Sequence, residues 1–258
     1  MIDSHCHLDF KHFDGIRDEV VTEAVGAGVH TIVNIGTDLA TSKKSIEFAE
    51  RFESVYATVG VHPHDAKTLD DRTFDELSDL VDHERVVAVG EIGLDYYRNL
   101  SPKDVQRKAF ERQLELAVDK KMPIVIHTRE SFEDTFDIVK RFAFDLPGGV
   151  FHCFPGDKTD AQRVFELGFI ISVGGVITFK NSSMSRMVAE VPLDKVMLET
   201  DAPFLTPVPY RGKTNRPSYV RYVRDKLAEL HGLAVAEVEN VTDRTARKFY
   251  SLVETFGG

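Results

Sequence analysis

The chain has 258 residues, of which 42% are hydrophobic and 29% are charged. This composition is ordinary for a soluble globular protein and excludes a disordered chain, which would carry fewer apolar and more charged residues. Lysine and arginine number 32 against 42 aspartate and glutamate residues, which gives a formal net charge of −10. That balance excludes a broadly basic nucleic-acid clamp, although it permits a local basic patch.

We expect no targeting or membrane-spanning segment in this chain. It contains no run of about 18 apolar residues, and its first residues lack the basic and apolar zones of a signal peptide. Two cysteines, Cys6 and Cys153, are too few for a disulfide framework in a chain of this length. We therefore expect a cytoplasmic protein without membrane contact or an obligatory protein partner, folded as one domain over residues 1–258.

Eight short apolar runs recur along the chain, with longer helical patterns between them. We expect strands, in chain order, at Ile2–Cys6, Val29–Gly36, Val55–Val61, Val86–Ile92, Pro123–His127, Gly149–Cys153, Phe169–Val173 and Lys195–Glu199. Strands that alternate with helices are typical of βαβ units and a parallel sheet. Eight repeats predict an α/β fold that closes into a (β/α)8 TIM barrel.

The segments between these runs predict the helices. Ser101 as a cap and Pro102 as the first helical residue are typical of a helix start. Further helices are expected at Asp14–Ala27, Asp38–Phe52, Phe74–His83, Ser131–Phe142, Lys158–Leu167, Pro217–Leu230 and Ala236–Phe256. The crossover at Asn181–Glu190 is short and polar, so only one or two helical turns are expected there.

Polar residues follow the predicted strands at their carboxyl ends. They are His5, His7, Glu91, His127, His152 and Asp201. In a parallel barrel these ends meet at one rim, so four imidazoles and two carboxylates are expected to converge. His5 and His7 are two residues apart on a strand, which turns both rings to one face and Cys6 to the other.

Each of these residues alone has an ordinary structural explanation. A histidine at a strand end often only satisfies polar groups of the core. A buried carboxylate needs a partner, however, and neither Glu91 nor Asp201 has a Lys or Arg beside it in the sequence. Four imidazoles and two carboxylates exceed one tetrahedral site but suit two divalent metals that share a bridging carboxylate. This set therefore predicts metal-assisted hydrolysis, and its many nitrogen ligands favour Zn, Mn, Co or Ni over Mg.

Six segments spread over nearly the whole chain carry a family resemblance. They are residues 3–9 (DSHCHLD), 60–64 (GVHPH), 90–97 (GEIGLDYY), 123–129 (PIVIHTR), 152–154 (HCF) and 198–203 (LETDAP). Together they resemble the motifs of TatD-type metal-dependent deoxyribonucleases. The resemblance implies an amidohydrolase-like TIM barrel with its metal site at the C-terminal rim of the strands. It also implies a Mg-stimulated nuclease, commonly a 3′ to 5′ exonuclease on single-stranded DNA.

The resemblance also implies a division of the ligands. His5, His7, Glu91 and Asp201 would hold one metal, and Glu91, His127 and His152 the other, with Glu91 as the bridge. A bridging carboxylate has both oxygens committed, so we expect Asp201 to accept the proton of the attacking water. Glu91 and Asp201 are thus the expected catalytic residues. Mg prefers oxygen ligands, so Mg, Mn and Zn all stay candidates for the two ions.

The expected substrate is DNA or another nucleic acid. Its expected contacts are His62, Tyr96, Arg129, Arg211 and Lys213, because cations and imidazoles bind phosphates and aromatic rings stack on bases. Arg216 stands where the family's loop usually has an acid, which makes the loop after Asp201 more basic.

Two alternatives stay open. An amidohydrolase relative could cleave another ester, such as aminoacyl-tRNA, a lactone or a phosphotriester, although such relatives often bridge their metals with a carboxylated lysine where this chain has Glu91. A binding protein could also keep the ligands without catalysis, but storage does not require a base such as Asp201. Release of mononucleotides from single-stranded DNA, compared with lactone or ester turnover, distinguishes these functions.

Overall fold

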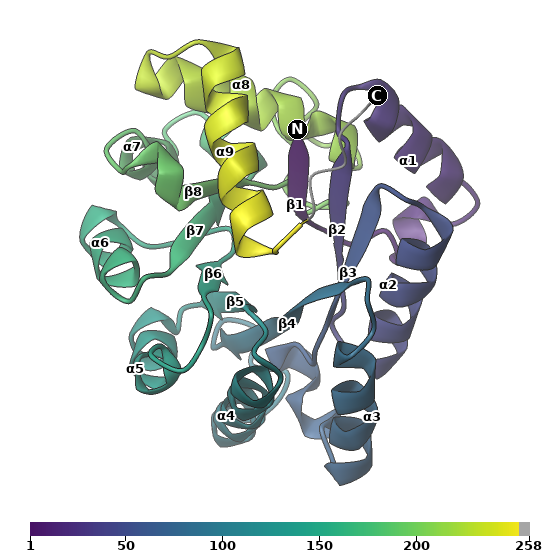
Figure 1. Ribbon diagram of the computed structural model, residues 1–258. Coiled ribbons are helices and arrows are strands. Elements are labelled where there is room, and N and C mark those ends of the chain that lie inside the picture. The colour runs from purple at the N-terminus through teal and green to yellow at the C-terminus, as the bar shows by residue number, and fades with distance from the viewer. Residues whose placement is uncertain (253–258) are drawn as a thin grey trace.

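The computed structural model describes residues 1–252, and its eight parallel strands follow one another around a nearly closed barrel (Figure 1). The strands are β1 (Ile2–Cys6), β2 (Thr31–Ile35), β3 (Val55–Val59), β4 (Val86–Asp95), β5 (Ile124–Arg129), β6 (Gly149–Phe151), β7 (Ile170–Val173) and β8 (Val196–Leu198). The predicted TIM barrel is confirmed. The domain limits of 1–258 stay a prediction, because residues 253–258 lie outside the described part.

The barrel closes between its last strand and its first through residues that follow β8. The amide of Asp201 donates to the carbonyl of His5 at 2.9 Å, and the amide of His7 donates to the carbonyl of Ala202 at 2.7 Å. Ala202 also forms a parallel bridge with Cys6. We call these contacts the β8–β1 seam.

Strand β4 runs three residues beyond its predicted end at Ile92, to Asp95. Gly93 permits this because its φ is +142° and a Cβ there would lie 2.0 Å from the carbonyl oxygen of His127 on β5. The extension places Glu91 and Asp95 on one strand. Both carboxylates lie next to the imidazole of His127 on β5.

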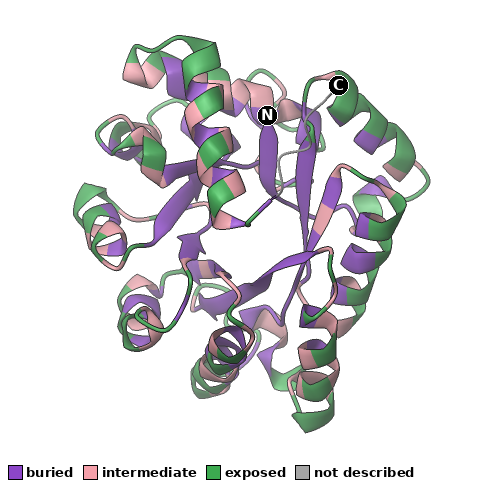
Figure 2. Cartoon of the chain, viewed as in Figure 1, coloured by how far each residue is buried: buried purple, intermediate pink, exposed green. Residues whose placement is uncertain are grey.

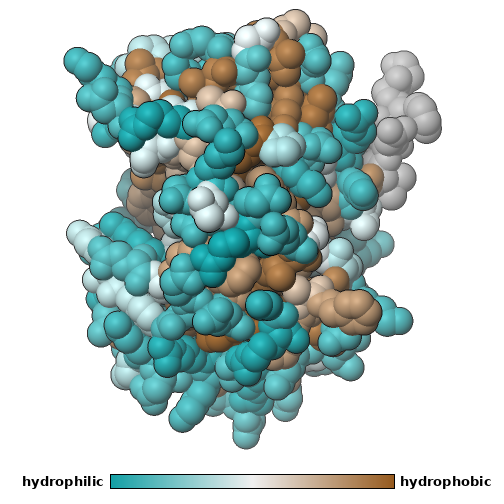
Figure 3. Space-filling model, turned by 90° about the vertical axis from the view of Figure 1, so that its left-hand side faces the viewer, coloured by the Kyte–Doolittle hydropathy of each residue, from teal (hydrophilic) through white to brown (hydrophobic). Residues whose placement is uncertain are grey.

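Helices cover the outside of the strands. They are α1 (Arg17–Gly26), α2 (Leu39–Arg51), α3 (Asp71–Val81), α4 (Lys103–Lys120), α5 (Phe132–Phe142), α6 (Lys158–Glu166), α7 (Ser183–Val188), α8 (Val220–His231) and α9 (Val235–Phe249). Figure 2 shows buried strands, and helices that are buried mainly on the side facing them. The face over α5 to α8 is mainly hydrophilic with smaller hydrophobic areas (Figure 3). Within the described residues, no helix is both long and apolar enough to cross a membrane.

Several helix boundaries differ from the sequence prediction: α1 begins at Arg17 and not Asp14, α3 at Asp71 and not Phe74, and α8 at Val220 and not Pro217. Pro102, not Ser101, is the cap of α4, because the Ser101 hydroxyl instead donates to the carbonyl of His64 at 2.8 Å. The last helix, expected to reach Phe256, ends at Phe249; residues 253–256 lie outside the described range.

Helix α9 crosses the amino-terminal end of the barrel (Figure 1). Asp243 on α9 accepts a hydrogen bond from the amide of Ile2 at 2.9 Å, and the Tyr250 hydroxyl just beyond it donates to the carbonyl of Ser4 at 3.0 Å. Helix α9 and the residue just beyond it therefore cover the amino-terminal end of the barrel. A functional site is expected at the opposite, carboxyl-terminal rim.

Candidate metal centre

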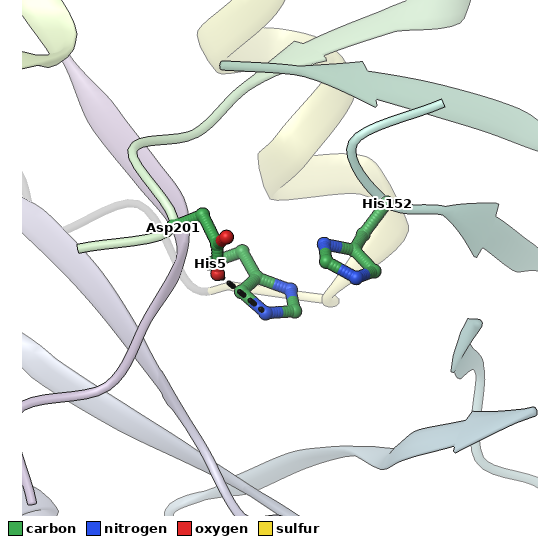
Figure 4. Close-up of side chains that lie close together, drawn as sticks. All are labelled: His5, His152 and Asp201. Atoms are coloured by element: carbon green, nitrogen blue, oxygen red, sulfur yellow. Dashed lines mark ion pairs between the residues drawn. The ribbon is translucent and has the colours of Figure 1, made fainter. Parts of the chain in front are cut away.

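The carboxyl ends of five strands bring all six predicted ligands together. We call them the six-residue cluster: His5 and His7 at the end of β1, Glu91 on β4, His127 on β5, His152 directly after β6 and Asp201 after β8. Figure 4 shows His5, His152 and Asp201 around one space; the rings of His5 and His152 stack with centroids 4.0 Å apart, and the Asp201 carboxylate lies 3.8 Å from Nε2 of His5. The predicted convergence is therefore present in the structure.

Glu91 lies between two pairs of imidazoles. Its Oε1 is 2.7 Å from Nδ1 of His127 and 2.9 Å from Nε2 of His152. Its Oε2 is 3.5 Å from Nε2 of His5 and 3.9 Å from Nε2 of His7. One oxygen thus faces each pair, which is the arrangement that a bridging carboxylate requires.

The nitrogens of His5 and His7 provide a test of whether this set fits a metal. Within residues 1–252, both nitrogens of His5 and Nδ1 of His7 are buried without a hydrogen-bond partner, which is costly unless something else binds them. His7 Nε2 lies 3.4 Å from Asp201 Oδ1. Ligand atoms at 2.0–2.2 Å from one ion are about 3.0–3.5 Å apart, so these residues fit a divalent metal.

The imidazoles and carboxylates of the cluster shift one another's pKa values. Burial and the nearby His152 lower the pKa of His5, so its ring is neutral and offers a lone pair. Burial opposes ionisation of Glu91, but His152, His62 and His127 outweigh it and hold the pKa of that carboxyl well below its usual range. Burial lowers the pKa of His7, His127 and His152, but the neighbouring carboxylates outweigh burial and raise it. Because metals bind neutral imidazoles and ionised carboxylates, binding of an ion at these three rings would release their protons.

Asp95 is a site residue that the sequence analysis did not assign. Its Oδ2 lies 3.1 Å from Nε2 of His127 and 2.9 Å from Nε2 of His64. Burial raises the pKa of Asp95, but the hydrogen bonds from His127 and His64 reverse this and lower it. An ionised Asp95 that accepts the Nε2 proton of His127 leaves Nδ1, the nitrogen nearest Glu91, with the lone pair.

Glu199 is a second acid near the cluster that the sequence analysis did not assign to the site. It is fully buried, accepts a hydrogen bond from the Ser172 hydroxyl, and has its other oxygen 3.7 Å from Nδ1 of His152. Both acids stand inside the motifs quoted above. Their spacing was the available signal, since Asp95 follows Glu91 by four residues on one strand and Glu199 precedes Asp201 by two.

His62, predicted as a phosphate contact, lies among the cluster's imidazoles. Its Nε2 is 3.5 Å from Oε1 of Glu91, and its ring centroid is 4.4 Å from that of His127. Burial, followed by the charge of His127, lowers the pKa of His62 well below its usual value. A group of side chains that could bind an ion comprises His62, Glu91 and His127. His62 is therefore close enough to the cluster to contact either a bound ion or an oxygen of the substrate.

The predicted cations form no ion pair with an acid in the described part of the chain. The guanidinium of Arg129 covers the ring of Tyr97 at 3.8 Å, and that of Arg211 covers Phe179 at 3.6 Å. Lys213 extends towards Tyr210, 5.5 Å from its ring. Stacking leaves their charged edges free for phosphates.

Two other loop residues are engaged in helix contacts. The Tyr96 hydroxyl donates to Asp134 on α5 at 2.7 Å and accepts from Arg107 on α4 at 2.9 Å. Arg216 pairs with Glu23 on α1, so the extra charge of the loop is neutralised there. Base stacking by Tyr96 stays a prediction.

Both cysteines are free thiols. Burial raises the pKa of Cys6 and of Cys153 well above the usual value. Neither belongs to a possible ligand group among residues 1–252, in keeping with the prediction that Cys6 faces away from the site.

Comparisons with known proteins place this geometry in a family. The family model described as "TatD related DNase" matches residues 2–251. The chain is 38% identical over 253 residues to the "Uncharacterized metal-dependent hydrolase YabD" of Bacillus subtilis, covering 98% of this chain and 99% of the relative. It is 32% identical over 256 residues to the "3′-5′ ssDNA/RNA exonuclease TatD" of Cronobacter sakazakii, covering 97% of each.

Solved structures agree with these matches. The TatD homolog YJJV of Escherichia coli K12 superposes with a TM-score of 0.92 at 31% identity, covering 98% of each chain. An organophosphorus hydrolase of Deinococcus radiodurans, at 13% identity and a TM-score of 0.65 over 96% of this chain and 92% of its own, shares the fold alone. With its motifs, barrel and site in agreement, the chain belongs to the TatD-related DNase family and is a metal-dependent hydrolase.

Proposed function

We propose that this hydrolase cleaves phosphodiester bonds of single-stranded DNA, from the 3′ end, with two divalent ions held by the six-residue cluster. The observation that carries the proposal is the position of Glu91, which turns one oxygen to each of two imidazole pairs. Two-metal sites are typical of nucleases and phosphatases. The name of the Cronobacter relative supports a single-stranded DNA or RNA substrate.

The proposed ligands divide as follows. His5, His7, Glu91 and Asp201 hold one ion, and Glu91, His127 and His152 hold the other. Asp95 orients His127 through its hydrogen bond to Nε2, and Glu199 places a carboxylate oxygen 3.7 Å from Nδ1 of His152. When bound, Mg, Mn or Zn supplies the positive charge that lowers the pKa of a water and offsets the charge of phosphoryl oxygens.

Asp201 is the proposed proton acceptor. Its contacts with His5 and His7 both use Oδ1, which leaves Oδ2 for a proton. Burial raises the pKa of Asp201, but the hydrogen bond and charge of His7 outweigh burial and lower it. Asp201 is therefore ionised at neutral pH, the form a general base requires.

Basic side chains at the rim of the barrel bind the negative charges of the substrate. Arg129, Arg211 and Lys213 bind phosphates of the strand, since none of them has an acidic partner among the described residues. His62 donates to an oxygen of the phosphate beside Glu91. These contacts position the scissile bond against the cluster.

Metal analysis followed by a substrate comparison tests the proposal. The protein is purified without chelator, its metals are quantified, and the stripped protein is reloaded with Mg, Mn, Zn or Co. Single-stranded DNA and RNA labelled at either end, duplex DNA, an aminoacyl ester, a lactone and a phosphotriester are then assayed in parallel. Mononucleotide release from the 3′ end is expected; turnover of the esters or lactone without nucleotide release would overturn the nuclease assignment.

A further inference from the structure

Two partly exposed aromatic side chains lie beside the six-residue cluster, on the loops that follow β1 and β8. Phe10 stacks on the imidazole of His7, with ring centroids 4.8 Å apart and planes 25° apart. Phe204 meets Phe10 edge to face, with centroids 5.6 Å apart. We call Phe10 and Phe204 the ring pair. It extends from a proposed metal ligand out to solvent, where 42% of Phe204 is exposed.

The position of Phe204 is fixed by its backbone. Its amide donates to the carbonyl of Asp201 at 2.8 Å. The buried side chain of Asn215 donates to the carbonyls of Phe204 and Thr200, at 2.6 and 2.7 Å. The ring is thus held next to the cluster with much of its surface uncovered, and a rigid ring loses little entropy when it binds a flat ligand.

We infer that the ring pair binds the nucleobase next to the scissile phosphodiester. This inference rests on the proposed nuclease function and extends it to the selection of the substrate. A nucleobase presents a flat π face, and stacking on an aromatic ring tolerates any base. In a duplex those faces are covered by neighbouring base pairs, so the ring pair admits an unpaired end and disfavours an intact duplex.

The surroundings of the ring pair suit both parts of a nucleotide, the charged phosphate and the flat base. Phosphate oxygens meet the cluster and the rim cations Arg129, Arg211 and Lys213, whereas the apolar base face meets Phe204. An exposed phenylalanine alone indicates nothing, because single exposed apolar residues are common. Phe204 differs because it reaches His7 through Phe10, within two ring contacts.

Phe144 provides a matched control. It is 99% exposed and lies between α5 and β6, at the amino-terminal end of the barrel and away from the cluster. Phe204→Ala, Phe204→Trp and Phe144→Ala are compared with the wild type, all loaded with the same metal. The substrates are a short thymidine oligonucleotide, the same oligonucleotide with an abasic terminal residue, and bis(p-nitrophenyl) phosphate, a phosphodiester without a base. Binding is measured separately with a hydrolysis-resistant phosphorothioate oligonucleotide.

For Phe204→Ala, the ratio of kcat/KM on the oligonucleotide to kcat/KM on the baseless ester is expected to fall about 5- to 150-fold, the factor that corresponds to about 1–3 kcal/mol per stacked base. The loss should lie mainly in KM and be mirrored in phosphorothioate affinity. The wild type should lose a similar factor on the abasic end, and Phe204→Ala little more. Phe204→Trp should retain the ratio, and Phe144→Ala should match the wild type.

Equal losses on both substrates, or less bound metal in Phe204→Ala, would overturn base binding in favour of a structural role. Unchanged kinetics of Phe204→Ala on an oligonucleotide that the wild type cleaves would overturn the ring pair and leave the nuclease function standing. A wild type that binds the phosphorothioate through Phe204 but cleaves no oligonucleotide with any metal would instead overturn the nuclease function alone.

Discussion

The carboxylate of Asp95 and the imidazole of His127 meet on neighbouring strands, with Oδ2 of the acid 3.1 Å from Nε2 of the ring. The opposite nitrogen, Nδ1, lies 2.7 Å from Glu91. The same oxygen of Asp95 also lies 2.9 Å from His64. Asp95 is therefore placed to fix which nitrogen His127 turns to the cluster.

Removal of that charge should weaken metal binding without unfolding the barrel. Asp95→Asn is expected to lower the affinity for one of the two ions about 10- to 100-fold, because the proton of His127 is no longer held on Nε2. Titration calorimetry measures the affinity, and ¹⁵N NMR of the imidazoles reports the tautomer. The control is Asp134→Asn, an acid on the same rim that pairs with Tyr96 instead of a histidine. Wild-type affinity with an unchanged tautomer would contradict the positioning role.

Glu91→Ala should abolish the binding of both metals, since each oxygen of Glu91 faces a different imidazole pair. Bound metal is expected to fall from two ions per chain to none, with activity below that of every single-histidine variant. His127→Ala is the comparison, because it belongs to only one proposed site and should keep the other ion. Metal analysis and turnover are measured on one preparation. Two retained ions with near-normal turnover in Glu91→Ala would exclude the binuclear arrangement.

Asp201→Asn should separate proton transfer from metal binding. Asp201 has a φ of +54°, a region that asparagine tolerates, so the substitution preserves the backbone as well as one ligating oxygen. Activity is expected to fall about 10²- to 10⁴-fold with most of the metal retained. Melting temperature, bound metal and single-turnover rate test this together. A folded, metal-loaded variant with the wild-type rate would remove the assignment as base.

Asp243 should make folding sensitive to acid at the closed end of the barrel. It accepts from the amide of Ile2 and lies 2.9 Å from Nε2 of His30. Burial raises the pKa of Asp243, but the hydrogen bond with His30 and the terminal amine outweigh burial and hold the pKa below 3.8. The folded chain therefore binds fewer protons than the unfolded chain at low pH. Its stabilisation is complete above about pH 4 and is lost as the pH falls through the folded-state value.

Asp243→Asn is thus expected to lower the free energy of unfolding by about 1–3 kcal/mol at pH 7, since hydrogen bonds to a charged group are lost. The difference from the wild type should shrink below about pH 4. Urea unfolding across this range measures it, with Asp119→Asn, an exposed acid on α4, as the control. A difference that stays constant down to low pH would show that the charge of Asp243 contributes nothing.

The strands were predictable because those of a parallel barrel are covered on both faces and are therefore apolar along their length. The end of β4 was not, because Gly93 interrupts the apolar run and the contact that extends the strand comes from His127, more than thirty residues away. Similarly, Ser101 has the local signature of a helix cap, but a tertiary bond to His64 takes its hydroxyl. Local patterns predict elements well and their ends less well, since ends depend on distant contacts.

The candidate ligands were predictable because each one follows a strand, where chain position alone fixes the rim on which it lies. The roles of Asp95 and Glu199 were not, although both residues stand in the same motifs. Their function depends on which nitrogen of a distant ring they face, and periodicity contains no such information. The ring pair could not be predicted for the same reason, because the contact between Phe10 and Phe204 joins residues 194 positions apart in the sequence (204 − 10).

The β8–β1 seam has a consequence for the dynamics of the barrel. Its backbone bonds belong to His5, His7, Asp201 and Ala202, and the side chains of the first three face the proposed ions. If the seam opens, these ligands separate, so ion binding and seam closure must stabilise each other. The amides of His7 and Asp201 should consequently exchange with deuterium faster in stripped protein than in loaded protein, while amides in the middle of β3 exchange alike in both. The backbone contacts that close the eight-stranded sheet into a barrel would then be stabilised by the same ions that the site uses for catalysis.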